Sequence, residues 1–214
     1  MARRPKSPTR TISNRGEYPR FIGYFPCTKG AKVPLLFDSI SALKVGIYLE
    51  WLPRVRRVEF EPRQHTVADG DKSFKCIPDY EATTQLGEIE VYEGKYSPDS
   101  VADTSRTRLS AISRTMAREG YRYQVLYRNI LERRGFIQTI SKLRHYGQLT
   151  FPDSVLRHAL AVLASATPRT LGQFVSTALD NGIRVGVLYH LAYHRKLRLR
   201  YELPRHMELE LCRV

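Results

Sequence analysis

Hydrophobic and polar residues alternate over several short stretches in the N-terminal part of the chain, which is typical of β-strands. Two segments there have helical periodicity instead, at 38–52 and 104–119. Pro53 is predicted to stop the first helix. Thr104 is predicted to cap the second helix, and Gly120 to end it. The alternating stretches lie at 55–60, 64–67, 72–77, 80–84, 87–93 and 121–127. A helix, antiparallel strands, a helix and a further strand predict a mixed α/β domain.

After residue 130 the strand-like pattern stops. A helical connector is predicted at 130–147, followed by three short helical stretches at 151–166, 170–179 and 184–196. Residues 196–211 then alternate in two runs on either side of Pro204, as the strands of a hairpin do. Three helices and a small hairpin predict a winged-helix-like domain.

These patterns divide the chain into three parts. Residues 1–20 are basic and proline-containing and predict a flexible arm. An α/β domain is expected at 21–135, and the winged-helix-like C-terminal domain at 136–214.

The charge of the chain predicts an anionic partner. There are 35 Lys and Arg against 21 Asp and Glu, a formal net charge of +14, which favours contact with nucleic acid. The basic residues expected to bind DNA occur in separate clusters: Arg56, Arg57, Arg106, Arg114, Arg118, Arg195, Lys196, Arg198 and Arg200. The three cysteines form no CxxC pair, and their odd number without a signal sequence predicts a reducing cytoplasm. No apolar run is long enough to predict a membrane span, so no membrane partner is expected.

Candidate chemistry is concentrated in a predicted hairpin. Metal-dependent DNA hydrolysis needs carboxylates that converge on a cation, and a positive group near the attacking water. A strand that begins with Asp, followed by a strand with an acid and a Lys two positions apart, supplies these groups on one face. Here Pro78-Asp79 begins the first strand, and Glu90-Val91-Tyr92 lies on the second.

Residues 33–135 resemble the catalytic domain of TnsA-type endonucleases, a family of heteromeric transposase subunits in the restriction-endonuclease-like PD-(D/E)xK superfamily. The resemblance rests on the segments YLEWLPRV, IPDY, IEVY and REGYRYQVLY. It implies a restriction-endonuclease-like core and a C-terminal winged-helix-like module. It also implies a DDE-type transposase and an AAA+ regulator as partners, Mg²⁺ as the cofactor of an active enzyme, and the ends of a transposon as the DNA.

Two positions depart from the family pattern. The helix glutamate of the family falls on Ala42, and the strand lysine falls on Tyr92. Alanine has no oxygen for a metal, and a tyrosine phenol is neutral near pH 7. A migrated site would use Asp38, Asp79 and Glu90 for metal and Lys95, predicted just beyond the strand, as the positive group.

The sequence therefore favours a TnsA-like, DNA-binding subunit whose 5′-strand cleavage is weakened or lost, in effect a pseudoenzyme. Two alternatives stay open. One is an active Mg²⁺-dependent DNA endonuclease with the migrated site. The other is a regulator that binds DNA through its winged helix.

Overall fold

The computed structural model describes residues 22–30, 34–166, 170–203 and 206–211. The chain forms two compact units, Met1–Leu131 and Glu132–Val214, and each is described by itself. The boundary expected from the sequence, between 135 and 136, lies close to this division. The predicted arm at 1–20 lies outside the described residues.

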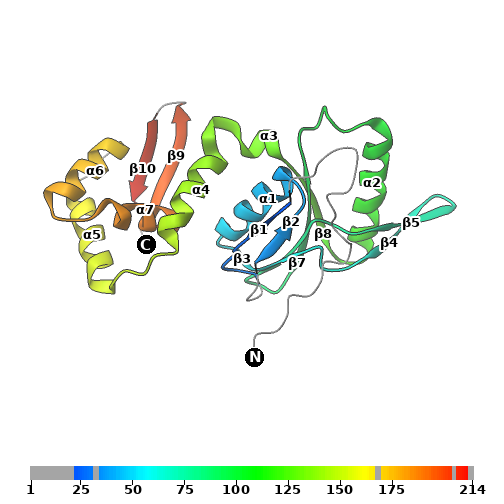
Figure 1. Ribbon diagram of the computed structural model, residues 1–214, viewed down its shortest axis with the longest axis horizontal. Helices are drawn as coiled ribbons and strands as arrows, with labels where there is room; N and C mark the ends of the chain where they lie inside the picture. The colour runs from blue at the N-terminus through cyan, green and yellow to red at the C-terminus, as the bar shows by residue number, and fades with distance from the viewer. Residues whose placement is uncertain (1–21, 31–33, 167–169, 204–205, 212–214) are drawn as a thin grey trace. The chain divides into compact units, whose positions relative to one another are not determined.

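Unit 1 contains a four-stranded mixed sheet between two helices (Figure 1). Its elements are β1 (Gly23–Phe25), β2 (Leu35–Phe37), α1 (Ile40–Trp51), β3 (Val55–Phe60), β4 (His65–Asp69), β5 (Lys72–Cys76), β6 (Tyr80–Thr84), β7 (Ile89–Lys95), α2 (Asp103–Arg118), β8 (Arg122–Tyr127) and α3 (Arg128–Leu131). The sheet order is β3-β6-β7-β8, with β7 and β8 parallel and the other neighbours antiparallel. The predicted mixed α/β class is confirmed, whereas the sequence analysis missed the β1–β2 hairpin.

Helix α1 covers one face of the sheet at very close range. Ser39 caps it by accepting a hydrogen bond from Ala42 N at 3.0 Å, and Tyr80 of β6 donates its hydroxyl to the Ala42 carbonyl at 2.8 Å. A Cβ on Gly46 would lie 2.8 Å from the Tyr80 hydroxyl oxygen, so only glycine fits there. A Cβ on Gly94 of β7 would lie 3.3 Å from the helix backbone. The two glycines therefore set the distance between helix and sheet.

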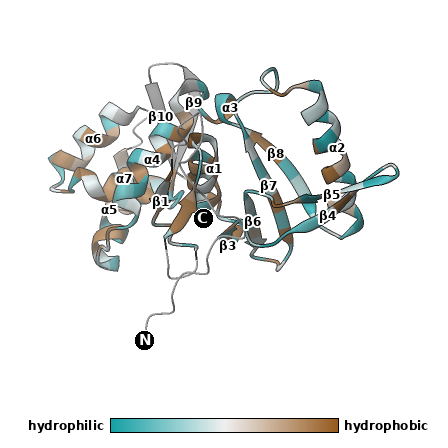
Figure 2. Cartoon of the chain, turned by 45° about the vertical axis from the view of Figure 1, so that its right-hand side comes forward, coloured by the Kyte–Doolittle hydropathy of each residue, from teal (hydrophilic) through white to brown (hydrophobic). Residues whose placement is uncertain are grey.

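Helix α2 covers the opposite face of the sheet. Successive side chains of β7 point to opposite faces, so Val91 contacts α2 while Gly94 faces α1. The buried residues of α2 pack with the β4–β5 hairpin and β7 in one apolar cluster: Val67, Cys76, Val91, Ala111, Ile112 and Met116. The N-cap is Ala102 and makes no side-chain cap bond, so the predicted capping by Thr104 is wrong. The β4–β5 hairpin extends past α2 (Figure 1), and its tip is hydrophilic (Figure 2).

Strand β7 spans Ile89–Lys95, so it has the predicted length but lies two residues further along the chain than the predicted stretch 87–93. Its parallel partner β8 continues the pairing as far as Lys95, which lies opposite Tyr127. Lys95 is therefore a strand residue with a fixed direction, and the expectation that it lies beyond the strand is wrong. Strict alternation along β7 places Val91, Glu93 and Lys95 on the face of α2, and the residues between them on the face of α1.

Unit 2 is helical with a terminal hairpin. It consists of η1 (Arg133–Gly135), α4 (Phe136–Gly147), α5 (Asp153–Ala166), α6 (Leu171–Asp180), α7 (Val185–Tyr193), β9 (Leu197–Leu203) and β10 (His206–Leu211). The predicted order of helices and antiparallel hairpin strands is confirmed. Helix α7 is central: Val187, Leu188 and Leu191 are buried in the core of the unit. None of the described helices is long and apolar enough to cross a membrane.

Replacing Gly147 should disrupt the packing of α4 on α7. A Cβ at position 147 would lie 2.0 Å from Tyr193 Cδ1 and 2.4 Å from Cγ, near the root of the ring, where rotation cannot relieve the clash. We expect Gly147→Ala to lower the free energy of unfolding of unit 2 by about 2–3 kcal/mol, measured by urea denaturation. Gly172→Ala is the matched control, because its Cβ would meet only Thr170 Oγ1 at 3.9 Å. Equal stability of the two variants would contradict this packing.

Candidate active site at the ends of strands β6 and β7

The pairing of β6 with β7 decides which acids meet. The register pairs Tyr80 with Tyr92 and Ala82 with Glu90, so one further step places Asp79 opposite Glu93. Directly opposed residues of an antiparallel pair project on the same face. A hydrogen bond of 2.7 Å from Gly94 N to Asp79 Oδ2 holds the aspartate at this position. Asp79 and Glu93 therefore share the α2 face of the sheet.

Lys95 completes this group. It lies two residues beyond Glu93 on the same face, and its Nζ is 2.6 Å from Glu93 Oε1. Burial alone would lower the pKa of Lys95, but the charge of Glu93 and the hydrogen bond between them raise it overall. The ammonium therefore keeps its positive charge at neutral pH. Asp79, Glu93 and Lys95 are called the acid–lysine site below.

The site carries uncompensated negative charge. Burial, and then the negative charge of Glu93, raise the pKa of Asp79 from 3.8 to about 7. The Gly94 amide and Lys95 act in the opposite direction without cancelling these effects. A buried carboxyl next to a second carboxylate is poorly stable as an anion unless a cation joins it. The electrostatics therefore favour either a proton or a metal ion at Asp79.

These residues fit a magnesium ion. Two carboxylates are a sufficient protein contribution, because Mg²⁺ usually keeps several waters and binds through one or two carboxylates together with substrate phosphates. Among the described residues no group of three or more His, Cys, Asp or Glu forms a metal site. The acid–lysine site thus fits Mg²⁺ better than a metal that requires a closed set of protein ligands.

Glu90 and Tyr92 do not belong to this site. Both project on the α1 face, where the Tyr92 hydroxyl donates to Glu90 Oε2 at 2.6 Å and Arg54 Nη2 lies 3.0 Å from the same oxygen. Arg122 Nη1 is 3.5 Å from Glu90 Oε1. The expectation that Glu90 holds metal beside Asp79 is corrected: the two side chains lie on opposite faces, and Glu90 is a buried partner of arginines.

The other two expected positions behave differently. Ala42 is fully buried and contacts the sheet through its carbonyl, so it is a packing position of α1. Asp38 lies directly before the N-cap Ser39, and its charge contributes to raising the pKa of Asp79. Asp38 is therefore in the electrostatic neighbourhood of the acid–lysine site, although its expected role as a ligand is not established by a contact.

Sequence reasoning missed Glu93 as a functional residue. The letters Glu93-Gly94-Lys95 have the expected acid-x-lysine spacing, and they follow Pro78-Asp79. The alternation of hydrophobic and polar residues predicts a strand that ends at Glu93, which leaves Lys95 outside it. Gly94 interrupts that pattern, and a larger residue there would be tight against α1, because an added Cβ would lie 3.3 Å from the helix backbone.

The basic residues expected to bind DNA are distributed over both units. In unit 1, Arg56 and Arg57 are exposed on β3, and Arg118 is exposed in the last turn of α2. Arg106 donates hydrogen bonds to the carbonyls of Val101 and Pro98. Arg114 Nη2 lies 3.9 Å from Asp69 Oδ1. In unit 2, Lys196 is exposed and Arg195 has a φ of 57°. The register of β9 and β10 places Arg198 opposite Glu210 and Arg200 opposite Glu208.

Helix α7 has little free surface. Four of its nine residues are buried, and His190 and His194 lie 3.2 Å and 3.0 Å from the carbonyl oxygens of Tyr146 and Gly147 in α4. The helix before the hairpin is therefore packed on more than one side within its own unit.

No protein-family model matches the chain, and no curated protein matches it.

Neutralising Asp79 should stabilise the protein in a pH-dependent way. The folded state holds the proton of Asp79 more tightly than the unfolded state, so this group costs stability progressively as pH rises from about 4 to about 7. Asp79→Asn keeps an acceptor for Gly94 N but removes the charge. We expect the melting temperature of Asp79→Asn to exceed that of the wild type at pH 8, and this difference to vanish near pH 4.

Scanning calorimetry without divalent ions measures this difference. Asp71→Asn, an exposed change in the turn of the β4–β5 hairpin, is the control and should show no such pH dependence. Added Mg²⁺ should raise the melting temperature of the wild type more than that of Asp79→Asn, because ligand binding stabilises the folded state. A wild-type advantage at pH 8 would contradict the electrostatics of the site.

Proposed function

We propose that the chain is a Mg²⁺-dependent DNA endonuclease subunit of the TnsA-like type, with hydrolysis carried by the acid–lysine site. The observation that carries this proposal is the β6–β7 register, which brings Asp79 and Glu93 to one face with Lys95 two residues on. The order of α1, the strands, α2 and β8 around a mixed sheet supports a restriction-endonuclease-like core. This proposal favours cleavage over the pseudoenzyme expected from Ala42 and Tyr92.

Each residue of the site has a chemical role in this proposal. Asp79 and Glu93 would hold Mg²⁺ through carboxylate oxygens. Such an ion would supply an activated water and neutralise charge on the phosphate. Lys95, held next to Glu93, places an ammonium where the scissile phosphate and the attacking water meet, and stabilises the negative charge that develops there. The same arrangement explains why Asp79 tolerates burial beside a second acid.

The DNA contact of unit 1 is proposed for the surface of α2. This helix lies on the face of the sheet that carries the acid–lysine site, and its exposed side presents Arg114 and Arg118. Arginines on a helix near a hydrolytic site are well placed to bind phosphates of the flanking DNA. The net charge of +14 supports a large electrostatic part of the binding energy.

For unit 2 we propose contact with a protein partner rather than reading of a DNA groove. A recognition helix needs an exposed face to enter the major groove, whereas α7 is packed against α4. The positive positions of β9 also lie opposite glutamates, which reduces the net charge of the hairpin. The partners proposed from the TnsA resemblance, a DDE-type transposase and an AAA+ regulator, suit this role at transposon ends.

Cleavage should depend on Glu93 and not on Glu90. We expect Glu93→Gln to lower the rate of Mg²⁺-dependent nicking of supercoiled plasmid by about two orders of magnitude or more, because it removes a charged metal ligand. Lys95→Ala should have a similar effect. The rate is measured per folded molecule by gel electrophoresis of the nicked and linear products.

Glu90→Gln is the matched control, since it makes the same chemical change on the other face. It should leave the nicking rate per folded molecule within about twofold, while the lost charge beside Arg54 lowers the melting temperature. A loss of cleavage in Glu90→Gln with full activity in Glu93→Gln would overturn the assignment of the site.

Neutralising the α2 arginines should weaken DNA binding without changing sequence preference. We expect Arg118→Gln and Arg114→Gln each to reduce the slope of log K against log salt by about 1, as the loss of one phosphate contact does. Fluorescence anisotropy with labelled duplexes over a range of salt measures the slope. Lys72→Gln, at the end of the β4–β5 hairpin turn, controls for general loss of charge. Identical slopes for all three variants would argue against the α2 surface.

A further inference from the structure

We propose that the hydroxyl of Tyr123 is a substrate-binding group of the acid–lysine site, donating a hydrogen bond to an anionic oxygen of the bound DNA phosphate. The inference rests on the proposed function and adds a residue that the acid–lysine pattern does not contain. It comes from three independent features: the position of Tyr123 in the sheet, the burial of its hydroxyl, and the charges around it.

The sheet places Tyr123 on the correct face. It lies on β8 directly opposite Val91 of the parallel strand β7, and the next residue of β7 on that face is Glu93. The ring packs against the apolar cluster under α2. The hydroxyl is the only polar part of the side chain, and the register confines it to the same face as the acid–lysine site.

The hydroxyl is buried, and it has no hydrogen-bond partner among the described residues. A buried hydroxyl without a partner costs about 1–3 kcal/mol, so such a group calls for a ligand or another function. Glu93 accepts from Lys95 and Asp79 accepts from Gly94, and neither carboxylate forms a hydrogen bond with the Tyr123 hydroxyl. The arrangement therefore leaves a donor ready inside the site.

The charges that act on Tyr123 agree with the position that the sheet gives it. Burial raises the pKa of Tyr123 strongly, and the charges that raise it further are first Glu93, then Cys76 and Asp79. The phenol is thus close enough to both acids to sense their charge, and it stays protonated at every physiological pH. A neutral phenol whose hydrogen is free acts as a donor, and it favours an anionic acceptor.

A phosphate oxygen is the acceptor that fits best. The substrate must bring its phosphate to the carboxylates and to Lys95, and a phosphodiester carries its negative charge on two non-bridging oxygens. Lys95 can bind one of them, and Tyr123, which approaches from the neighbouring strand, can bind another. A hydrogen bond to a charged oxygen contributes about 1.5–3 kcal/mol, compared with about 1 kcal/mol for a neutral pair.

The test compares Tyr123→Phe with the wild type. Phenylalanine keeps the ring and its packing and removes only the oxygen. We measure binding of a fluorescein-labelled duplex by anisotropy in Ca²⁺, and nicking of plasmid in Mg²⁺. Tyr123→Phe should bind DNA about ten-fold more weakly in Ca²⁺ and nick it about ten-fold or more slowly. Its melting temperature should equal or exceed that of the wild type, because no existing hydrogen bond is lost.

Tyr121→Phe is the matched control. Its hydroxyl accepts a hydrogen bond from Arg63 Nη1 at 3.2 Å, away from the acid–lysine site, so both DNA affinity and nicking should stay within about twofold of wild type. A merely structural role of Tyr123 would lower the melting temperature of Tyr123→Phe and leave its affinity for DNA in Ca²⁺ intact.

The outcomes separate this inference from the proposed function. Wild-type affinity and nicking in Tyr123→Phe, with nicking lost in Asp79→Asn, would overturn the role of Tyr123 and leave the endonuclease intact. A wild-type protein that never nicks DNA, but loses Ca²⁺-dependent affinity on Tyr123→Phe, would overturn the hydrolytic function and support the phosphate contact. DNA binding that is independent of divalent ions and of Tyr123 would overturn both.

Discussion

The pairing register of β6 and β7 is the constraint on which the candidate site depends. Side chains of a strand alternate between its two faces, so a shift of one residue moves every group to the other side of the sheet. With Tyr80 opposite Tyr92, Asp79 meets Glu93, and Lys95 follows on the same face. The α1 side supports this register, because the rings of Tyr80 and Tyr92 are fully buried there and a shift of one residue would move a ring to the other face.

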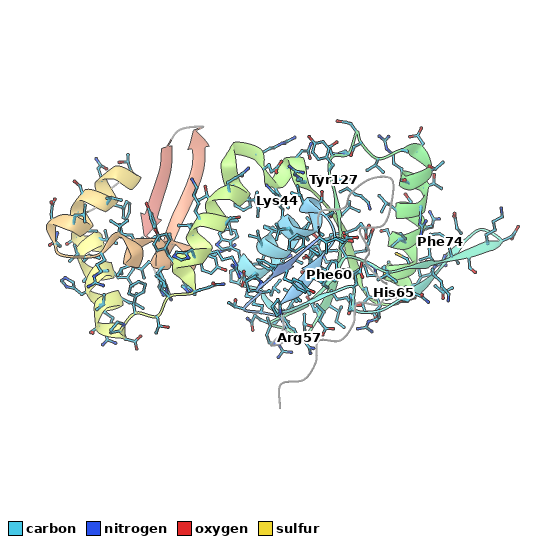
Figure 3. All side chains as sticks on the ribbon, in the orientation of Figure 1. Lys44, Arg57, Phe60, His65, Phe74 and Tyr127 are labelled. Carbon is cyan, nitrogen blue, oxygen red and sulfur yellow. The ribbon has the colours of Figure 1, made fainter. Side chains whose placement is uncertain are left out.

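The two faces of the sheet differ in how completely their buried polar groups are hydrogen-bonded and charge-compensated. On the α1 face, polar groups satisfy one another: Glu90 is neutralised by Arg54 and hydrogen-bonded to Tyr92, and Tyr80 is bonded to the helix. On the α2 face, the carboxyl of Asp79 and the hydroxyl of Tyr123 are buried with incomplete compensation. Figure 3 shows the described side chains on the ribbon and labels Phe74 of β5 in the hairpin. Complete satisfaction gives stability, whereas incomplete satisfaction leaves binding energy for a ligand.

The incomplete compensation on the α2 face links the stability of the protein to its proposed function. Burying an acid beside another acid destabilises the protein without a cation, and the same repulsion is released when a cation binds. Under the proposed function, the free energy lost through this repulsion would contribute to the affinity for the metal ion. On the other face, Gly46 and Gly94 allow α1 to pack closely on the sheet.

The sequence alone determined most of the elements and their order, although not the β1–β2 hairpin, because alternation and helical periodicity are local patterns set by which side must be buried. It also supplied Asp79, Lys95 and the basic character of the chain. It did not determine that β7 reaches Lys95, since that end point comes from pairing with β8, nor that Glu93 rather than Glu90 meets Asp79. Those are relations between strands distant in sequence, and only their register in the folded sheet decides them.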